Sequence, residues 1–199
     1  MFRRIVIGST AALLLVSATS AVAQDKAWQI RARGLLIAPN ASSTPTGLDV
    51  KANAVAEVDI TRFIGKKFAL ELVLGTSSQE VTAKTGNTVS SLGMVSHLPP
   101  TLTFQFRPVP TGAFQPYLGA GGNLTYFYAK SGDLENLDLS TSIGYAFQGG
   151  ADFALGGGAY FNLDVKYVNI QTDVKSGATK AYELKINPLL IGVGVGIRL

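Results

Sequence analysis

The residue types of this sequence that are best suited to chemistry do not form a catalytic constellation. His97 is the only histidine among 199 residues, and the chain has no cysteine. A single histidine without cysteine or a neighbouring acidic cluster is a poor metal site. Ser90, Ser91 and Ser96 lie near His97, but acyl transfer or hydrolysis also needs a base beside the nucleophile and an orienting group, and no such spacing is present. We therefore predict no catalytic residue, no metal site and no cofactor, and we predict that the protein is not an enzyme.

Charged side chains form a second chemically active set, because they recur at every second position of apolar segments. Side chains of a β-strand point alternately to its two faces, so charges spaced in this way share one face. Across a narrow interior they would form ion pairs and block it. Five acidic and five basic residues are predicted on this face: Glu57, Asp59, Glu71, Asp152 and Asp164, with Arg31, Arg33, Arg107, Lys166 and Arg198.

Eight segments carry the alternation that would position these charges. Two of them lie within residues 97–128 and are joined at residues 108–114. In the first of these two segments, Leu102 and Phe104 face one way, and Thr101 and Thr103 face the other. Each segment is near the length that a tilted strand needs to cross a bilayer. The other six are predicted at residues 28–38, 50–61, 67–76, 141–154, 160–170 and 182–199.

The connections between these segments alternate in length. Those after the second, fourth and sixth strands are short, whereas residues 39–49, 77–96, 129–140 and 171–180 form longer polar connections. This rhythm is typical of outer-membrane barrels. We predict an all-β fold, an eight-stranded antiparallel transmembrane β-barrel with short periplasmic turns and longer extracellular loops.

A soluble β-sandwich or lipocalin-like barrel is the alternative, because it also alternates, with its apolar face inward. Two observations favour the membrane barrel. Charges of both signs lie on the polar face, and aromatic residues lie near strand ends, as they do at the two membrane interfaces. These aromatic residues are Trp28, Phe68, Phe114, Tyr126, Tyr128, Tyr145, Phe153 and Tyr167.

The last segment, residues 182–199, breaks the strict period of two. Leu184 and Ile186 are even-numbered, whereas Ile191 and Val193 are odd-numbered. A bulge at residues 187–188 would restore one lipid-facing side, because a bulge inserts one extra residue and tolerates proline. Alternatively, one half of the strand places its apolar residues inside the barrel, and the sequence leaves both interpretations open.

The N-terminal residues indicate export. Arg3 and Arg4 precede an apolar run at residues 5–16, and Ala21-Val22-Ala23 is a cleavage signal. We predict a cleaved signal peptide at residues 1–23 and a barrel at residues 24–199; the apolar run is short for a membrane anchor. Removal of the signal peptide leaves 15 basic and 13 acidic residues, a net charge of +2, which gives no reason to expect nucleic-acid binding.

Several blocks of the sequence resemble the OmpW family of small outer-membrane proteins. Residues 97–102 read HLPPTL, as in the family, and residues 116–125 resemble its PYxGAGxNYT block, with Leu124 where tyrosine is usual. Residues 70–73, 165–170 and 187–198 resemble the family's VELL, WYxDI and terminal DPxxxxxGxGYRF segments. The sequence departs from the family at Leu199, where phenylalanine is usual, at Ile197, where tyrosine is usual, and in the short 39–49 connection.

The resemblance implies an outer-membrane protein surrounded by lipid and inserted by the barrel-insertion machinery, which reads the terminal strand. It also implies a narrow apolar channel that opens outward and releases small hydrophobic solutes sideways into the membrane. Proline has no N–H for a strand ladder, so we expect the lateral opening at His97, Leu98, Pro99 and Pro100. Ordinary strand initiation after a loop is the alternative role for these prolines.

Val73 and Phe127 are predicted to point inward in the outer third of the barrel, as channel lining or as plain packing. Two functions follow as hypotheses. The first is the binding or passage of small hydrophobic molecules. The second is a structural or adhesive barrel without transport, whose loops contact surface lipid or partners. The sequence leaves the oligomeric state open.

Overall fold

The computed structural model describes residues 26–38, 40, 42–44, 48–50, 53–85, 88–135, 138–176 and 179–199. The signal peptide predicted at residues 1–23 lies outside the described residues, and so does part of the 39–49 connection. Within the described ranges, no helix is both long enough and apolar enough to cross a membrane.

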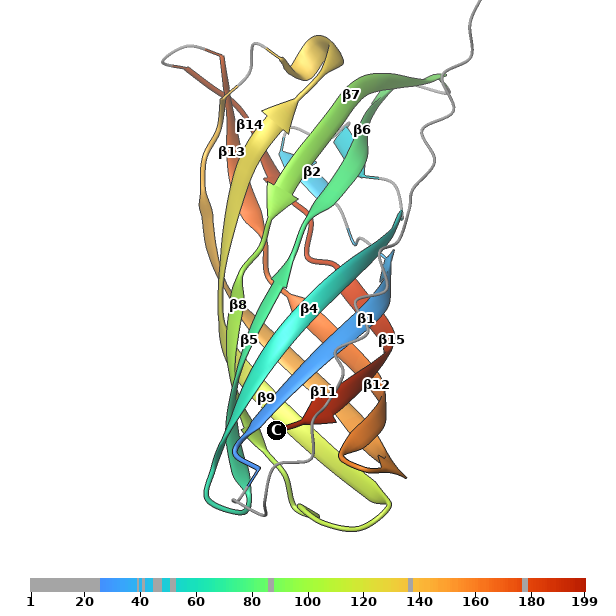
Figure 1. Ribbon diagram of the computed structural model, residues 1–199. Coiled ribbons are helices and arrows are strands. Elements are labelled where there is room, and N and C mark those ends of the chain that lie inside the picture. The colour runs from blue at the N-terminus through green and yellow to red at the C-terminus, as the bar shows by residue number, and fades with distance from the viewer. Residues whose placement is uncertain are drawn as a thin grey trace, which may run out of the picture.

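Eight strands close into an antiparallel barrel, which confirms the predicted architecture (Figure 1). Each strand pairs with the next barrel strand along the chain. The ring closes because β1, the first strand, also pairs with β15, the last one. The barrel strands are β1 (Trp28–Ala38), β4 (Asn53–Ile64), β5 (Phe68–Gly75), β8 (Thr101–Phe106), β9 (Phe114–Lys130), β11 (Ser142–Gly156), β12 (Ala159–Val168) and β15 (Leu189–Arg198).

Strand β1 shows how the sequence separates lipid from lumen. Trp28 and Ile30 are 47% and 39% exposed on the outer face, whereas Gln29 and Arg31 are completely buried inside. A barrel wall in a membrane must present apolar side chains outward, because lipid cannot hydrogen-bond to polar groups. The alternation of charged and apolar residues in the sequence therefore reports the two faces of this wall directly.

Above these strands the wall continues as two hairpins (Figure 1). One hairpin consists of β6 (Ser77–Thr85) and β7 (Thr88–Leu98), and the other of β13 (Gln171–Ser176) and β14 (Thr179–Lys185). Residues 77–96 and 171–180 are the longer connections that the sequence predicts, but most of their residues form strands, which was not predicted from the sequence. Smaller elements complete this upper extension: β2 (Ser42–Thr44), β3 (Leu48–Val50), β10 (Asp138–Leu139) and the 3-10 helix η1 (Gly132–Leu134).

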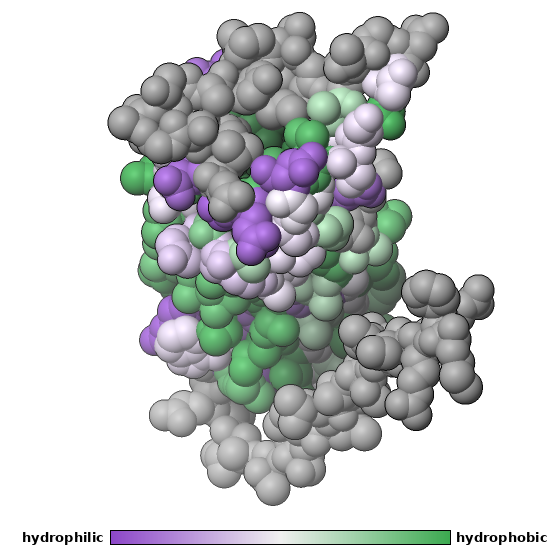
Figure 2. Space-filling view, turned by 90° about the horizontal axis from the view of Figure 1, so that it is seen from above, coloured by the Kyte–Doolittle hydropathy of each residue, from purple (hydrophilic) through white to green (hydrophobic). Residues whose placement is uncertain are grey.

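In the upper extension apolar side chains also point inward, beside buried polar ones such as Ser77 and His97. Val81 in β6 and Val95 in β7 are buried, whereas Ser78 faces outward. In β14, the buried Leu184 lies between two charged residues. Above the membrane the outside is water, so apolar side chains gain by pointing inward. Seen from above, hydrophilic side chains gather over the middle of the upper end, with hydrophobic side chains around them (Figure 2).

Inward-pointing apolar side chains in the upper extension also explain residues 182–199, which form two strands, β14 and β15. Leu184 and Ile186 are each 4% exposed and face inward, whereas Ile191 and Val193 lie on the lipid face. Of the two interpretations that the sequence leaves open, the structure therefore supports the second, in which one half of the segment places its apolar residues inside. Between the two halves, Asn187 adopts a φ of 38°, a left-handed conformation that asparagine tolerates better than most residues.

Candidate functional site

Arg31 lies at the centre of a buried polar network that fills the lower and middle lumen. Its Nε donates to Asp59 Oδ1 at 2.9 Å and its Nη1 to Asp152 Oδ1 at 3.3 Å. Its Nη2 forms an ion pair with Glu71. All four side chains are fully buried. One guanidinium from β1 therefore holds carboxylates from β4, β5 and β11 across the barrel.

Arg33 extends the network upward. Its Nη2 lies 2.7 Å from Glu57 Oε1, 2.9 Å from Asp59 Oδ2 and 3.1 Å from Glu71 Oε1. Glu57 in turn accepts from Lys166 Nζ at 3.2 Å. The Glu57–Lys166 pair thus forms the upper edge of the network.

Neutral groups complete the packing of the lumen. The Tyr117 hydroxyl donates to Asp164 Oδ2 at 2.8 Å and accepts from Asn162 Nδ2 at 3.0 Å. Asn162 Nδ2 also donates to Asp152 Oδ1 at 2.8 Å, and Arg107 forms an ion pair with Asp152. Paired in this way, the charges are retained at lower cost, whereas an isolated buried charge would be strongly unfavourable.

Nine of the ten charges predicted in the lumen are buried there: five carboxylates and four cations. Arg198 differs, because it lies partly buried at the lower mouth. Its guanidinium carbon is 4.2 Å from the centre of the Phe63 ring and 4.6 Å from that of Tyr160. Its Nη2 donates to Gln115 Oε1 at 3.1 Å. Arg198 is the last residue of β15 and therefore lies near the rim, which explains the difference.

Glycines in β15 make room for the arginines. Gly194 and Gly196 are the ladder partners of Arg33 and Arg31 in β1. A Cβ at Gly194 would lie 2.6 Å from Arg33 Cγ and 2.2 Å from the carbonyl oxygen of Ala32. These glycines thus let the long side chains lie flat against the neighbouring strand.

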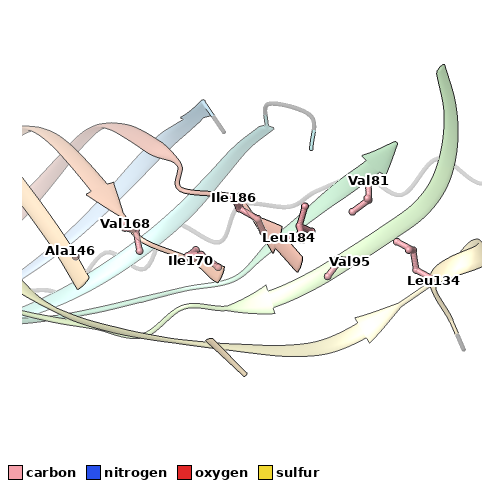
Figure 3. Packing of buried hydrophobic residues seen from close by; sticks show 8 residues of the cluster. All are labelled: Val81, Val95, Leu134, Ala146, Val168, Ile170, Leu184 and Ile186. Atoms are coloured by element: carbon pink, nitrogen blue, oxygen red, sulfur yellow. The ribbon is translucent and has the colours of Figure 1, made fainter. Parts of the chain in front are cut away.

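An apolar cavity lies above the network, with Glu57 and Lys166 at its edge. Further up, apolar side chains from both hairpins and from η1 form a buried cluster, of which Figure 3 shows eight residues, including Val81, Leu134 and Leu184. The cavity is small, with a volume of about 50 Å³, and its lining offers few polar groups to orient a molecule. Its apolar lining includes Leu35, Ile37, Val55, Val73, Val168 and Ile186.

The residues predicted for the channel and the lateral opening lie in different places. Val73, His97 and Pro99 line the cavity. Phe127 is not among its described lining residues; it packs against the apolar cluster, with its ring centre 5.8 Å from that of His97. Leu98 is 37% exposed on the outer face.

Pro100 lines a separate shallow depression on the outer face of the wall. This depression also involves Leu102, Leu124 and Gly144, together with Gly122, whose lack of a side chain hollows the surface. Pro99 therefore belongs to the inner cavity and Pro100 to the outer depression, so the proline pair lies in the wall between the two.

The β-ladder is interrupted beside the prolines on one side. Pairing of β5 with β8 ends at Val73 and Thr101, and pairing of β6 with β7 begins at Ser77 and His97. Among the described residues, no ladder pair joins residues 74–76 to residues 98–100. Towards β9 the wall stays connected, because Leu124 N donates to the Pro100 carbonyl oxygen at 3.0 Å.

A second interruption, between β4 and β6, was not predicted from the sequence. Pairing of β4 with β5 ends at Glu57 and Gly75, and no ladder pair joins the described part of β4 to β6. Ala56, Gly75 and Thr76 nevertheless line the cavity. Their alternation looks like ordinary wall, so nothing in the residue types reveals that the strands separate here.

A closed eight-stranded wall with apolar residues outside, an ion-paired lumen and an apolar upper cavity defines a small outer-membrane β-barrel. Comparison with known proteins supports this class. The model of the OmpW family matches residues 14–199, and the chain belongs to the OmpW family of outer-membrane proteins.

Relatives and a solved structure agree with this assignment. The chain is 35% identical over 182 residues to uncharacterized outer-membrane protein y4mB of Sinorhizobium fredii, covering 86% of this chain and 79% of the relative. It is 28% identical over 110 residues to dibenzothiophene metabolism operon protein PahQ of Pseudomonas aeruginosa, covering 53% and 52%. The crystal structure of OprG from Pseudomonas aeruginosa superposes with a TM-score of 0.75 at 26% identity, covering 86% of this chain and 95% of OprG.

Proposed function

We propose that this protein passes small hydrophobic molecules from outside the cell into the outer membrane. A solute enters the upper extension, occupies the apolar cavity and leaves sideways through the wall. The observation that carries the proposal is an apolar cavity directly above a closed polar lumen. An apolar molecule gains by entering the cavity but has no favourable way further down.

The closed lumen excludes a straight path through the barrel. An eight-stranded barrel is just wide enough for side chains to fill its interior, and here large polar side chains do so. A solute moving downward would have to break the Glu57–Lys166 pair and then the contacts of Arg33 and Arg31. The remaining way out is through the side of the barrel.

Both interruptions of the β-ladder support an exit at the level of the cavity. Residues 74–77 lie between them, with β4 on one side and residues 98–100 on the other. Gly75, Thr76 and Pro99 border the cavity, so strand separation there would connect it to lipid. The outer depression beside Pro100 offers the solute a lipid-facing surface on which to leave.

The name of the relative PahQ supports an apolar solute, because dibenzothiophene is a neutral aromatic molecule. The contacts of Ser77 and His97 support binding rather than catalysis. These two residues are cross-strand neighbours, yet Ser77 Oγ makes no hydrogen bond within the described part of the chain. An activated nucleophile requires such a bond to its base.

Uptake of a fluorescently labelled apolar solute into liposomes tests the proposal. The wild-type protein should accelerate uptake over protein-free liposomes. The Pro99→Ala/Pro100→Ala double variant should reduce uptake, because the N–H restored at residue 99 can pair across the interruption, whereas the backbone groups of residue 100 point towards β9. Pro108→Ala/Pro110→Ala, in the turn between β8 and β9, is the matched control and should leave uptake unchanged.

Two outcomes would contradict the proposal in different ways. Unchanged uptake by a folded Pro99→Ala/Pro100→Ala variant would exclude the exit at the prolines. If the wild-type protein gave no acceleration at all, transport itself would be excluded and a structural or adhesive barrel would be favoured.

A further inference from the structure

One part of the cavity wall is polar without being internally paired. Ser77 is 5% exposed and lines the cavity, and its Oγ has no hydrogen-bond partner among the described residues. His97, its ladder partner, lines the same cavity, and its ring contacts Phe127. An unpaired buried hydroxyl costs free energy unless a ligand satisfies it. We call these two residues the serine–histidine pair.

Glu57 and Thr101, two other polar residues at the cavity, already have hydrogen-bond partners. Glu57 accepts from Lys166 Nζ at 3.2 and 3.4 Å. Thr101 Oγ1 donates to the Pro99 carbonyl oxygen at 3.0 Å and accepts from Asn123 Nδ2 at 2.8 Å. The serine–histidine pair is therefore a place where the wall itself still offers hydrogen bonds to a molecule in the cavity.

We propose that the serine–histidine pair binds the hydroxyl group of a small apolar alcohol or phenol whose hydrocarbon part fills the cavity. The proposal rests on the proposed function and names its substrate class. A serine hydroxyl and a neutral imidazole each offer both a donor and an acceptor, and so does an alcohol. Directly opposed residues of an antiparallel ladder have Cβ atoms about 4.5–5.5 Å apart, so one oxygen atom can reach both side chains.

The ion pair at the cavity edge favours a neutral head group over an anionic one. Glu57 and Lys166 both line the cavity and bind each other, so Lys166 is already engaged and Glu57 would repel a carboxylate on the solute. A carboxylate would also need to lose its charge or its hydration to leave through the wall into lipid. A hydroxyl group avoids both penalties.

Nuclear magnetic resonance of the full barrel in lipid nanodiscs tests the proposal, because His97 is the only histidine and gives a single imidazole reporter. The protein is labelled with nitrogen-15 in histidine and titrated with 1-hexanol or n-hexane. Hexanol should shift the imidazole signals saturably. Ser77→Ala should weaken hexanol binding about threefold to tenfold, the worth of one hydrogen bond, and leave hexane binding unchanged or tighter. Ser77→Thr retains the hydroxyl and should restore hexanol binding.

Ser78→Ala is the matched control, because it removes the neighbouring hydroxyl from the outer face of the same strand, where Ser78 Oγ lies 2.7 Å from Ser96 Oγ. It should leave both titrations unchanged. Equal loss of hexanol binding in Ser77→Ala and Ser78→Ala would overturn the serine–histidine site, and so would no loss in Ser77→Ala. In either case, binding of hexane would still support the apolar cavity. If neither probe shifted the signals, the proposed function would fail together with it.

Discussion

Glu71 is the most heavily coordinated carboxylate of the lumen. Five side chains from β1, β8 and β11 direct donors at its two oxygens, and the residue is fully buried. A carboxylate can remain charged in such a place only if its partners replace the lost water. The donors are Arg31, Arg33, Thr103, Gln105 and Gln148.

Replacing this carboxylate by an amide should be costly. Glu71→Gln removes the negative charge that pairs with both Arg31 and Arg33. It also turns an N–H₂ group towards other hydrogen-bond donors. We expect a loss of about 3–5 kcal/mol in the free energy of unfolding, as for other broken buried ion pairs. Urea unfolding of the wild-type protein and the variant in lipid vesicles measures this difference in the free energy of unfolding.

Asp164→Asn is the matched comparison within the same network. Asp164 accepts one hydrogen bond from Tyr117 and lies 3.7 Å from Arg33, a looser arrangement. We expect it to cost about 1 kcal/mol. Equal losses for the two variants would show that Glu71 has no special place in the network.

At the scale of the strand, the glycines of β15 set the distance between β1 and its neighbour. Gly194→Ala would place a Cβ 2.2 Å from a backbone oxygen, which only a backbone shift can relieve. We expect a loss of about 1–3 kcal/mol in unfolding free energy. Gly34→Ala is the control, because its Cβ would point outward with its nearest neighbour at 4.0 Å. A Gly194→Ala barrel as stable as Gly34→Ala would contradict the close packing described for β15.

The gap between β4 and β6 can be tested with a covalent link, because the chain has no cysteine of its own. Ala56→Cys and Thr76→Cys introduce two thiols that a short bifunctional reagent can join. This link should lower solute uptake, because it holds β4 against the segment that leads into β6. The matched control links Ala32 and Val58, which already pair in the ladder of β1 and β4. Similar uptake in both linked proteins would argue against an exit at this gap.

The sequence predicted the barrel strands well and the upper extension poorly, for one physical reason. Arg31, Glu57 and Asp59 mark the lumen because lipid forces apolar residues to the other face. Ser77 lies in β6, whose inward face carries polar and apolar residues together, so the face of each residue follows from strand register, which composition does not report. The separation of β4 from β6 likewise depends on pairing between distant segments.

For the whole molecule, the closed lumen has a consequence for ion flow. With its interior filled by paired charges, the barrel should show no stable conductance in a planar lipid bilayer. A water-filled porin in the same bilayer is the positive control. Large, long-lived current steps from the folded wild-type protein would show that the network does not close the lumen.

The span of the polar network also bears on how the chain reaches its folded state. Its members come from β1, β4, β5, β8, β9, β11 and β12, and the seam that completes the ring joins β1 to β15. Contacts between segments so distant along the chain form slowly, because a long loop must close first. Until that happens, the arginines of the first strand lack most of their counter-ions. We therefore expect insertion, closure and dehydration of the lumen to occur together in one late step, without a stable half-barrel on the way.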